Sequence, residues 1–252
     1  MVFVDLINAI DSAVEKAVSE EKTAILFSGG VDSSLLAFIA KKTNPEVVLY
    51  TVGTSGSEDI IHAMELASEM KMKQKILILN DQEIAELYQE AKIVTGEESR
   101  MKLELSVPLL ALCKKASADK VRNLICGSGA EELFLGYNSH KIEAKKETNL
   151  EKLRKKELAE LYEKDVKRNE MIAENCGVAL LAPFLDKEVV KAALEIPAKE
   201  NFCGDENKHI LRKAARKAGL PESACARPKR AMQYGSGVHE RIEKLMRQGR
   251  II

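Results

Sequence analysis

The sequence predicts an α/β fold, with a doubly wound, mostly parallel sheet followed by a C-terminal helical lobe. Short apolar runs alternate with segments of helical periodicity over the first half of the chain, which is typical of parallel strands joined by crossover helices. Beyond Tyr137 the chain is dense in Lys and Glu, and strand signals become few. We therefore expect an α/β core over residues 1–138 and a mainly helical extension over residues 139–252.

The first expected elements are a helix and a buried strand. Apolar residues at helical spacing predict a helix over residues 5–20, and the apolar run 23–27 predicts a parallel strand. Ser28, Gly29 and Gly30 end this strand, and a helix is expected over residues 32–42. The alternation then repeats, with strands over 46–52, 74–79 and 121–126 and helices over 59–70, 81–92 and 106–118.

The remaining segments are expected to be helices and loops. Residues 140–175 are rich in charge, and most of these charges are interpreted as a solvated face. Residues 182–252 are predicted to be helical with loops, interrupted at Pro183, Pro197, Pro221 and Pro228.

Composition excludes several classes of protein. Lys plus Arg equals Asp plus Glu, 39 each, and aromatic residues are 4% with no Trp, so nucleic acid is disfavoured as a partner. No apolar run approaches the ~20 residues of a membrane span, and the N-terminus does not resemble a signal peptide. The five cysteines are scattered without a C-x-x-C pair, which disfavours disulfides and zinc. A cytoplasmic protein without a membrane partner is expected.

The strongest local signal is SGGVDSS, residues 28–34, between an apolar strand and a helix. Glycines let the backbone turn tightly and present N–H groups, serines add hydroxyl donors, and the helix N-terminus adds a positive dipole end. A carboxylate inside this anion site needs a cation between itself and phosphate, and Mg²⁺ is suited to that position. The predicted phosphate cradle consists of Ser28, Gly29, Gly30, Asp32, Ser33 and Ser34.

This heptapeptide is not a P-loop, because no Lys follows the glycines. It resembles the PP-loop of the N-type ATP pyrophosphatases, which have a Rossmann-like fold and release pyrophosphate while leaving AMP on the substrate. That resemblance implies binding of ATP and Mg²⁺. GMP, NAD, argininosuccinate and asparagine synthetases and tRNA-thiolating enzymes share the motif, so the heptapeptide alone does not choose among them.

A second motif narrows the resemblance. CGSGAEELFLGY, residues 126–137, follows a predicted strand and is similar to SGEGADELFGGY of the asparagine synthetase synthetase domain. The carboxyl ends of parallel strands meet at one edge of a sheet, where ligands bind, so both motifs are expected to lie there. By the resemblance, Glu131 binds Mg²⁺ opposite Asp32, and Cys126 and Gly127 contact the nucleotide.

Further motifs follow in the order of that family. APFLD (182–186) resembles VPFLD, KHILR (208–212) resembles a motif whose Lys lies against the phosphates, and RPK (227–229) resembles an R-x-K motif that faces pyrophosphate. The resemblance therefore implies catalytic roles for Lys208, Arg227 and Lys229, whose charge would stabilise the departing pyrophosphate. It also implies that Leu26 and Val52 line the adenine pocket, although core packing explains them nearly as well.

The chain departs from the family pattern on the acceptor side. Three charged family positions are neutral here, at Ser128, Ala179 and Leu181. An aspartate substrate would bury charged groups without partners at these positions, so aspartate is expected to be a poor acceptor. No glutaminase domain is expected before the first helix, and no nucleophilic Cys follows Met1.

The resulting hypothesis is an adenylating ligase similar to asparagine synthetase. Its partners would be ATP, a small-molecule acceptor, and either free ammonia or a separate glutaminase subunit; a homo-oligomer is left open. Two alternatives stay open at this point. One is another PP-loop adenylation, such as tRNA modification, which the neutral charge and the missing C-x-x-C disfavour. The other is a non-catalytic nucleotide-binding subunit of a larger amidotransferase, against which Asp32 and Lys208 count.

Overall fold

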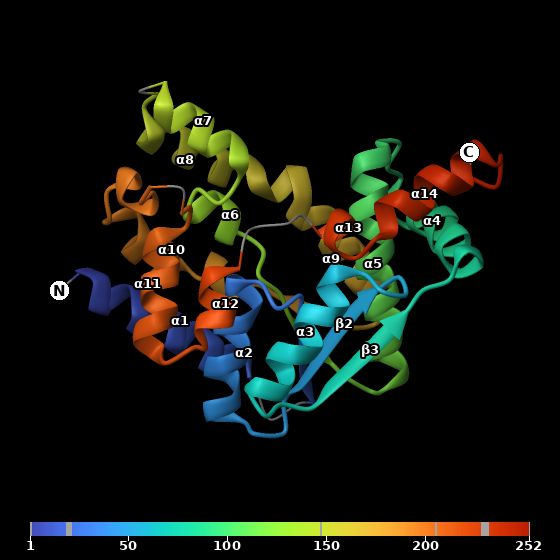
Figure 1. Ribbon diagram of the computed structural model, residues 1–252, viewed down its shortest axis with the longest axis horizontal. Helices are drawn as coiled ribbons and strands as arrows, with labels where there is room; N and C mark the ends of the chain where they lie inside the picture. The colour runs from blue at the N-terminus through green and yellow to red at the C-terminus, as the bar shows by residue number, and fades with distance from the viewer. Residues whose placement is uncertain (1, 19–21, 147, 205, 228–231, 252) are drawn as a thin grey trace.

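The fold is built around a five-stranded parallel sheet with the strand order β3-β2-β1-β4-β5. A computed structural model describes residues 2–18, 22–146, 148–204, 206–227 and 232–251 (Figure 1). The chain first extends the sheet from β1 toward β3 and then returns to the other side of β1. The carboxyl ends of β1 and β4 therefore flank the topological switch point of the sheet. The strands are β1 (Thr23–Leu26), β2 (Val48–Gly53), β3 (Gln74–Ile78), β4 (Asn123–Ile125) and β5 (Ala179–Leu181).

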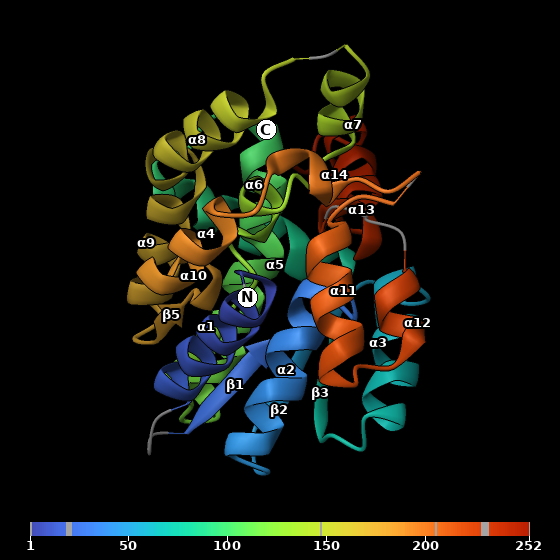
Figure 2. The same ribbon diagram turned by 90° about the vertical axis from the view of Figure 1, so that its left-hand side faces the viewer.

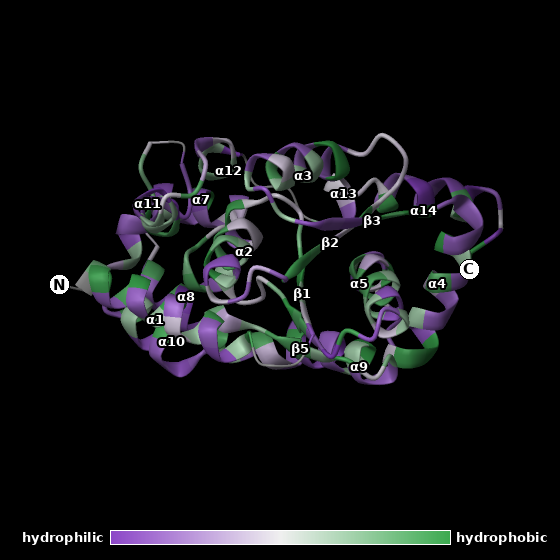
Figure 3. Cartoon of the chain, turned by 90° about the horizontal axis from the view of Figure 1, so that it is seen from below, coloured by the Kyte–Doolittle hydropathy of each residue, from purple (hydrophilic) through white to green (hydrophobic). Residues whose placement is uncertain are grey.

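Helices cover both faces of the sheet (Figure 3). One face carries α1 (Val2–Ala17), α2 (Val31–Thr43), α3 (Glu58–Glu69), α6 (Ala130–Leu133), α10 (Lys187–Leu194), α11 (His209–Ala218) and α12 (Glu222–Ala226). The other face carries α4 (Asp81–Thr95), α5 (Arg100–Ala118), α9 (Lys167–Asn175) and α14 (Val238–Arg247). The remaining helical segments are α7 (Asn138–Lys145), α8 (Leu150–Leu161), η1 (Tyr162–Val166), η2 (Pro183–Leu185), η3 (Ala198–Asn201) and α13 (Met232–Gly235).

The strands form two cores because successive residues point to opposite faces. In β1, Ile25 packs with the α1–α2 side, whereas Ala24 and Leu26 pack with the α4–α5 side. In β2, Leu49 belongs to the first core and Tyr50 to the second. Burial on both faces explains why these strands read as continuous apolar runs.

The predicted fold class is confirmed, and each of the four predicted strands is present. The predicted helix over 106–118 begins earlier, at Arg100, and the helix over 81–92 continues to Thr95. Strand β5 was missed because it has only three residues and pairs on one side, with β4. Such a short apolar run carries too little periodicity to be distinguished from a loop.

The C-terminal half packs closely on the first half. Helices α11 and α12 lie against α2 (Figure 2), and both hydrophobic cores contain residues from either side of residue 138. The domain boundary near residue 138 stays a prediction. Among the described residues, no helix is long and apolar enough to cross a membrane.

Arg154 is an exception to the solvated charges expected over residues 140–175. Its side chain is fully buried, and its guanidinium donates to the carbonyl oxygens of Ala193 (3.2 Å) and Ile196 (3.1 Å) and to the Glu151 carboxylate (2.6 Å). The last carbonyls of a helix lack partners within the helix, so this cation satisfies the end of α10. It thereby links α8 to the end of α10.

Candidate active site

The loop after β1 is shaped by Gly29 at the switch point of the sheet. Gly29 has φ +71°, in the left-handed region, and a Cβ there would lie 2.9 Å from the His62 ring and 3.3 Å from Ala63 Cα. Only glycine fits this turn against α3 without strain. The turn leads directly into α2, whose N-cap is Gly30. The N-terminal dipole of α2 is thus available to an anion beside the loop.

Two of the three loop hydroxyls lie together. Ser33 Oγ donates to the Gly30 carbonyl (3.2 Å) and lies 3.4 Å from Ser28 Oγ. Ser34 differs, because it is fully buried in α2 and its Oγ has no hydrogen-bond partner among the described residues. The structure brings Ser28 and Ser33 to a common cavity and leaves Ser34 away from its lining.

A cavity of about 220 Å³ opens at the carboxyl ends of β1, β2 and β4. Eight of the residues predicted to bind ATP or Mg²⁺ line it, Ser128 from the acceptor side lines it as well, and the phosphate-loop glycines shape the backbone beside it. The eight are Leu26, Ser28, Asp32, Ser33, Val52, Cys126, Gly127 and Glu131.

The cavity also contains residues that sequence reasoning missed. Tyr50 and Thr51 precede Val52 on β2, so their place at a strand end could have been a signal. No local sequence motif marks Leu112 on α5 or Met232 at the start of α13 as a site residue. They line the cavity because these helices pack against it. Leu26 and Val52 belong to the hydrophobic core and also line the cavity, and their contact with adenine stays a prediction.

Lys208 joins the two predicted metal ligands. Its Nζ donates to Asp32 Oδ2 at 2.6 Å and to Glu131 Oε1 at 2.7 Å, and its side chain is 2% exposed. Burial lowers the pKa of Lys208, but the carboxylates of Asp32 and Glu131 raise it by more, so the net shift is upward. Lys208 is therefore a buried cation between two carboxylates that come from separate motifs.

Backbone of the second motif approaches this cluster closely at Gly136. A Cβ at Gly136 would lie 2.0 Å from Lys208 Cε and 2.0 Å from Glu131 Oε2. The Gly136 carbonyl also accepts a hydrogen bond from the Asn207 side chain, next to Lys208. A side chain fits here only if the ends of the Lys208 and Glu131 side chains move, which would disturb the ion pair between them.

Gly136→Ala is expected to displace Lys208 and to lower both stability and activity. Overpacking of this kind typically costs about 1–3 kcal/mol in the free energy of unfolding. Urea denaturation and turnover assays measure the two effects. Gly56→Ala is the comparison, since a Cβ at Gly56 (φ +75°) meets nothing within 4 Å; it should lose some stability to backbone strain and keep its activity. Full activity of Gly136→Ala would contradict the close packing.

The residues present fit a Mg²⁺ ion that also uses phosphate oxygens. Asp32 Oδ1 is buried without a hydrogen-bond partner among the described residues, and Glu131 supplies a second carboxylate nearby. The described part of the chain contains no group of three or more His, Cys, Asp or Glu side chains able to hold a metal alone. Mg²⁺ commonly uses one or two carboxylates plus substrate phosphates and water. Asp32 and Glu131, together with phosphate oxygens of a bound nucleotide, would form a donor set of this kind.

Arg227 reaches the phosphate loop from the far end of the chain. Its guanidinium donates to the Ser28 carbonyl oxygen and, at 2.7 Å, to Asp59 Oδ1. Asp59 is itself buried at the start of α3. One donor of Arg227 thus binds the phosphate loop and another binds α3, so the guanidinium links the two. The predicted Lys229 lies outside the described residues.

A second polar network begins at Glu132, the residue after Glu131, and was not predicted from the sequence. Glu132, considered there only as a helix N-terminal carboxylate, is buried and accepts a hydrogen bond from the Tyr137 hydroxyl (2.7 Å). Burial raises the pKa of Glu132. His140 Nδ1 accepts from the Tyr137 backbone N–H (3.2 Å), and its Nε2 lies 2.8 Å from Glu157. This network connects α6, which carries Glu131, to α7 and α8.

Comparison with known proteins gives consistent matches along the chain. The profile of the family described as asparagine synthase matches residues 5–168 and 143–250. A putative glutamine-hydrolyzing asparagine synthetase 1 of Methanocaldococcus jannaschii is 32% identical, over 94% of this chain and 50% of that protein. Asparagine synthetase B (glutamine-hydrolyzing) of Escherichia coli K12 is 28% identical, over 90% of this chain and 44% of that protein. The chain spans about half the length of these curated relatives.

Among solved structures, an NH3-dependent NAD synthetase from Campylobacter jejuni aligns with a TM-score of 0.44 and 16% identity. The alignment covers 99% of this chain and 96% of that one.

Proposed function

Because this chain belongs to the asparagine synthase family, we propose that it is an ATP-dependent ligase that activates an acceptor as an adenylate and releases pyrophosphate. One observation carries the proposal. Lys208 Nζ lies within 2.7 Å of a carboxylate oxygen of both Asp32 and Glu131, and the three residues come from separate motifs that meet at the switch point of the sheet. A phosphate loop, two carboxylates and a buried cation at this place suit a nucleotide triphosphate.

The proposed reaction begins with attack of a carboxylate or amide-like oxygen of the acceptor on the α-phosphorus of ATP. The bond from that phosphorus to the β-bridging oxygen breaks, and pyrophosphate leaves. Ammonia or an amine then attacks the activated carbon, AMP departs, and the nitrogen loses a proton. The AMP-forming outcome follows from the PP-loop character of residues 28–34, which have no P-loop lysine.

Each residue in the cavity has a proposed task in that reaction. The hydroxyls of Ser28 and Ser33 and the N-terminus of α2 hold the pyrophosphate portion, and Arg227 keeps their loop in position. Lys208 supplies positive charge where pyrophosphate departs. Mg²⁺ held by Asp32 and Glu131 would withdraw negative charge from the phosphates.

The proposal extends to the setting of the reaction. The protein would act in the cytoplasm, on ATP and a small-molecule acceptor. Its nitrogen would come from free ammonia or from a separate glutaminase subunit, in keeping with the glutamine-hydrolyzing relatives that it matches over half their length. Leu26 and Val52 would contact the adenine, and Cys126 and Gly127 the nucleotide beside it.

The expected products are AMP and pyrophosphate in equal amounts. The purified chain is incubated with Mg·ATP, ammonia and a panel of carboxylic acids, and the nucleotides are quantified by chromatography. Lys208→Met, assayed in parallel, corrects for contaminating ATPases. ADP and phosphate as the main products that depend on this chain would overturn the assignment of the bond that breaks.

A further inference from the structure

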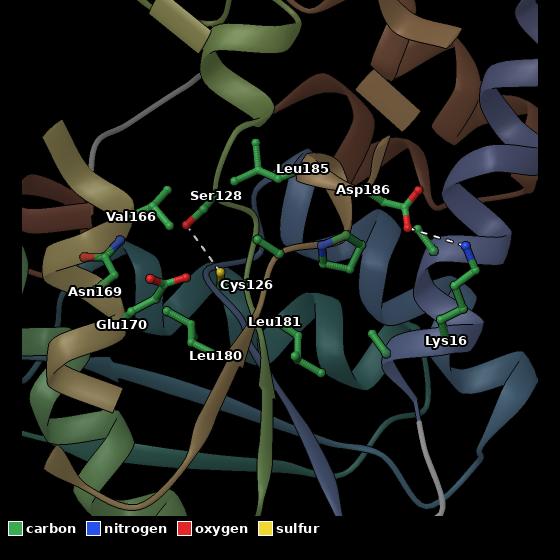
Figure 4. Close-up of a pocket in the computed structure, with 14 residues that line it drawn as sticks. Lys16, Cys126, Ser128, Val166, Asn169, Glu170, Leu180, Leu181, Leu185 and Asp186 are labelled. Carbon is green, nitrogen blue, oxygen red and sulfur yellow. Dashed lines mark hydrogen bonds and ion pairs between the residues drawn. The ribbon is translucent and has the colours of Figure 1, made fainter. Parts of the chain in front are cut away.

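A second cavity, of about 410 Å³, lies along the edge strand β5 (Figure 4). Residues of α1, η1, α9, β5 and η2 line it, together with Cys126 and Ser128 from the loop after β4, and we call it the β5 groove. Cys126 and Ser128 line both this groove and the nucleotide cavity. A molecule in the β5 groove is therefore adjacent to the place proposed for ATP.

The wall of the β5 groove is mainly apolar. Val166, Leu180, Leu181 and Leu185 contribute large aliphatic side chains. Of the three neutral positions noted in the sequence, Ser128 and Leu181 line the groove, whereas Ala179 is exposed outside its lining. The groove is thus suited to a ligand with an apolar body.

The charges in the β5 groove favour a cationic group on its ligand. Glu170 extends from α9 toward the side of Cys126 and Ser128 (Figure 4), and the Tyr162 hydroxyl is its hydrogen-bonding partner. At the other end, Lys16 and Asp186 form an ion pair with each other at 3.5 Å. Of the three charged side chains in the described lining, Lys16 and Asp186 pair with each other, and Glu170 forms no ion pair with either of them.

We propose that the β5 groove binds the acceptor, and that the acceptor is a carboxylic acid with an apolar body and an ammonium group that pairs with Glu170. This inference rests on the proposed function, which requires an acceptor next to the α-phosphate. The carboxylate of such a molecule would pass Ser128 and enter the nucleotide cavity, which Ser128 also lines, so that it lies beyond Glu170 and not beside it. Its ammonium group would lie against Glu170, and its methylene groups against Leu180 and Leu181.

The same wall discriminates against aspartate. One aspartate carboxylate would be activated and its ammonium could pair with Glu170, but its second carboxylate would meet an aliphatic surface at Leu181. The described lining offers only Lys16 as a cation, and Lys16 is paired with Asp186. An unpaired carboxylate against apolar side chains is strongly disfavoured.

The test measures binding of simple probes to the protein saturated with Mg²⁺ and an ATP analogue that cannot be cleaved between the α and β phosphates. Calorimetry compares ω-amino acids of four to eight carbons with the matching fatty acids, the matching dicarboxylates and aspartate. The best ω-amino acid should bind about tenfold more tightly than its fatty acid, because a charge-assisted hydrogen bond is gained. Dicarboxylates and aspartate should bind more weakly.

Two variants and one control make the test specific. Glu170→Gln should remove the preference for the ω-amino acid, and Leu181→Arg should improve binding of the dicarboxylates. Glu174→Gln, which changes an exposed carboxylate one turn along α9 outside the groove lining, should leave every preference unchanged.

Failure of this inference differs from failure of the proposed function. No binding of any ω-amino acid, equal binding of fatty and amino acids, or an unchanged preference in Glu170→Gln overturns the acceptor class. Affinity for the ATP analogue is measured separately, and its absence in the unaltered protein overturns the proposed function itself.

Discussion

Lys208→Met is expected to abolish measurable turnover and to lower the free energy of unfolding by about 3–5 kcal/mol, the usual cost of removing one partner of a buried ion pair. Methionine keeps the length and most of the apolar contacts of the lysine stem. It removes the ammonium group that donates to both Asp32 Oδ2 (2.6 Å) and Glu131 Oε1 (2.7 Å). Two neighbouring carboxylates would then repel each other in a partly buried site.

The measurements are urea denaturation and AMP production. Loss of a preorganised charge in an active site typically lowers the rate by about a hundredfold or more. Lys199→Met, at an exposed position, is the control and should behave like the unaltered protein. Added Mg²⁺ should stabilise Lys208→Met more than the unaltered protein, because a cation can replace the missing ammonium. A variant with normal stability and turnover would contradict the central role of Lys208.

Asp32→Asn is expected to lower magnesium-dependent turnover by about a hundredfold or more while leaving the fold intact. The substitution keeps the size of the side chain, and the amide oxygen can still accept a hydrogen bond from Lys208. What it removes is the negative charge and, with it, the buried Oδ1 carboxylate oxygen that has no hydrogen-bond partner among the described residues. The proposed metal site loses one of two carboxylates.

Turnover is measured across a Mg²⁺ titration, and circular dichroism checks the fold. Glu131→Gln should show the same loss, since it removes the second carboxylate. Asp5→Asn changes an exposed carboxylate on α1 and should have no effect. Near-normal turnover in both Asp32→Asn and Glu131→Gln would show that these residues do not hold the metal.

The phosphate loop illustrates what could be predicted from local sequence. Residues 23–27 and 28–34 contain an apolar strand, a glycine turn and a helix start in direct succession. These three features depend only on adjacent residues, so they can be recognised without knowledge of the tertiary structure. The second motif could be placed at the same edge of the sheet because parallel strands bring their carboxyl ends together.

Two of the predicted site residues, Ser34 and Arg227, make contacts that local sequence does not indicate. Ser34 was predicted to join the cradle, but helical geometry turns it into the core, where its hydroxyl lies away from the cavity. Arg227 was predicted to face pyrophosphate, and the structure uses two of its donors for Ser28 and Asp59. The catalytic and ligand-binding roles of all these residues stay proposals.

Local sequence was sufficient to predict the fold class, the positions of β1 to β4 and the two motifs at the strand ends, because apolar periodicity and glycine turns are properties of adjacent residues. The position of Lys208 between Asp32 and Glu131 depends on long-range packing, because these partners are 176 and 77 positions away in the chain. The same packing brings the Gly136 backbone close to Lys208 and Glu131, and it places Glu170 and Leu181 in one groove. Contacts between residues that are distant in the chain depend on how helices and strands pack, and this packing cannot be inferred from residue spacing.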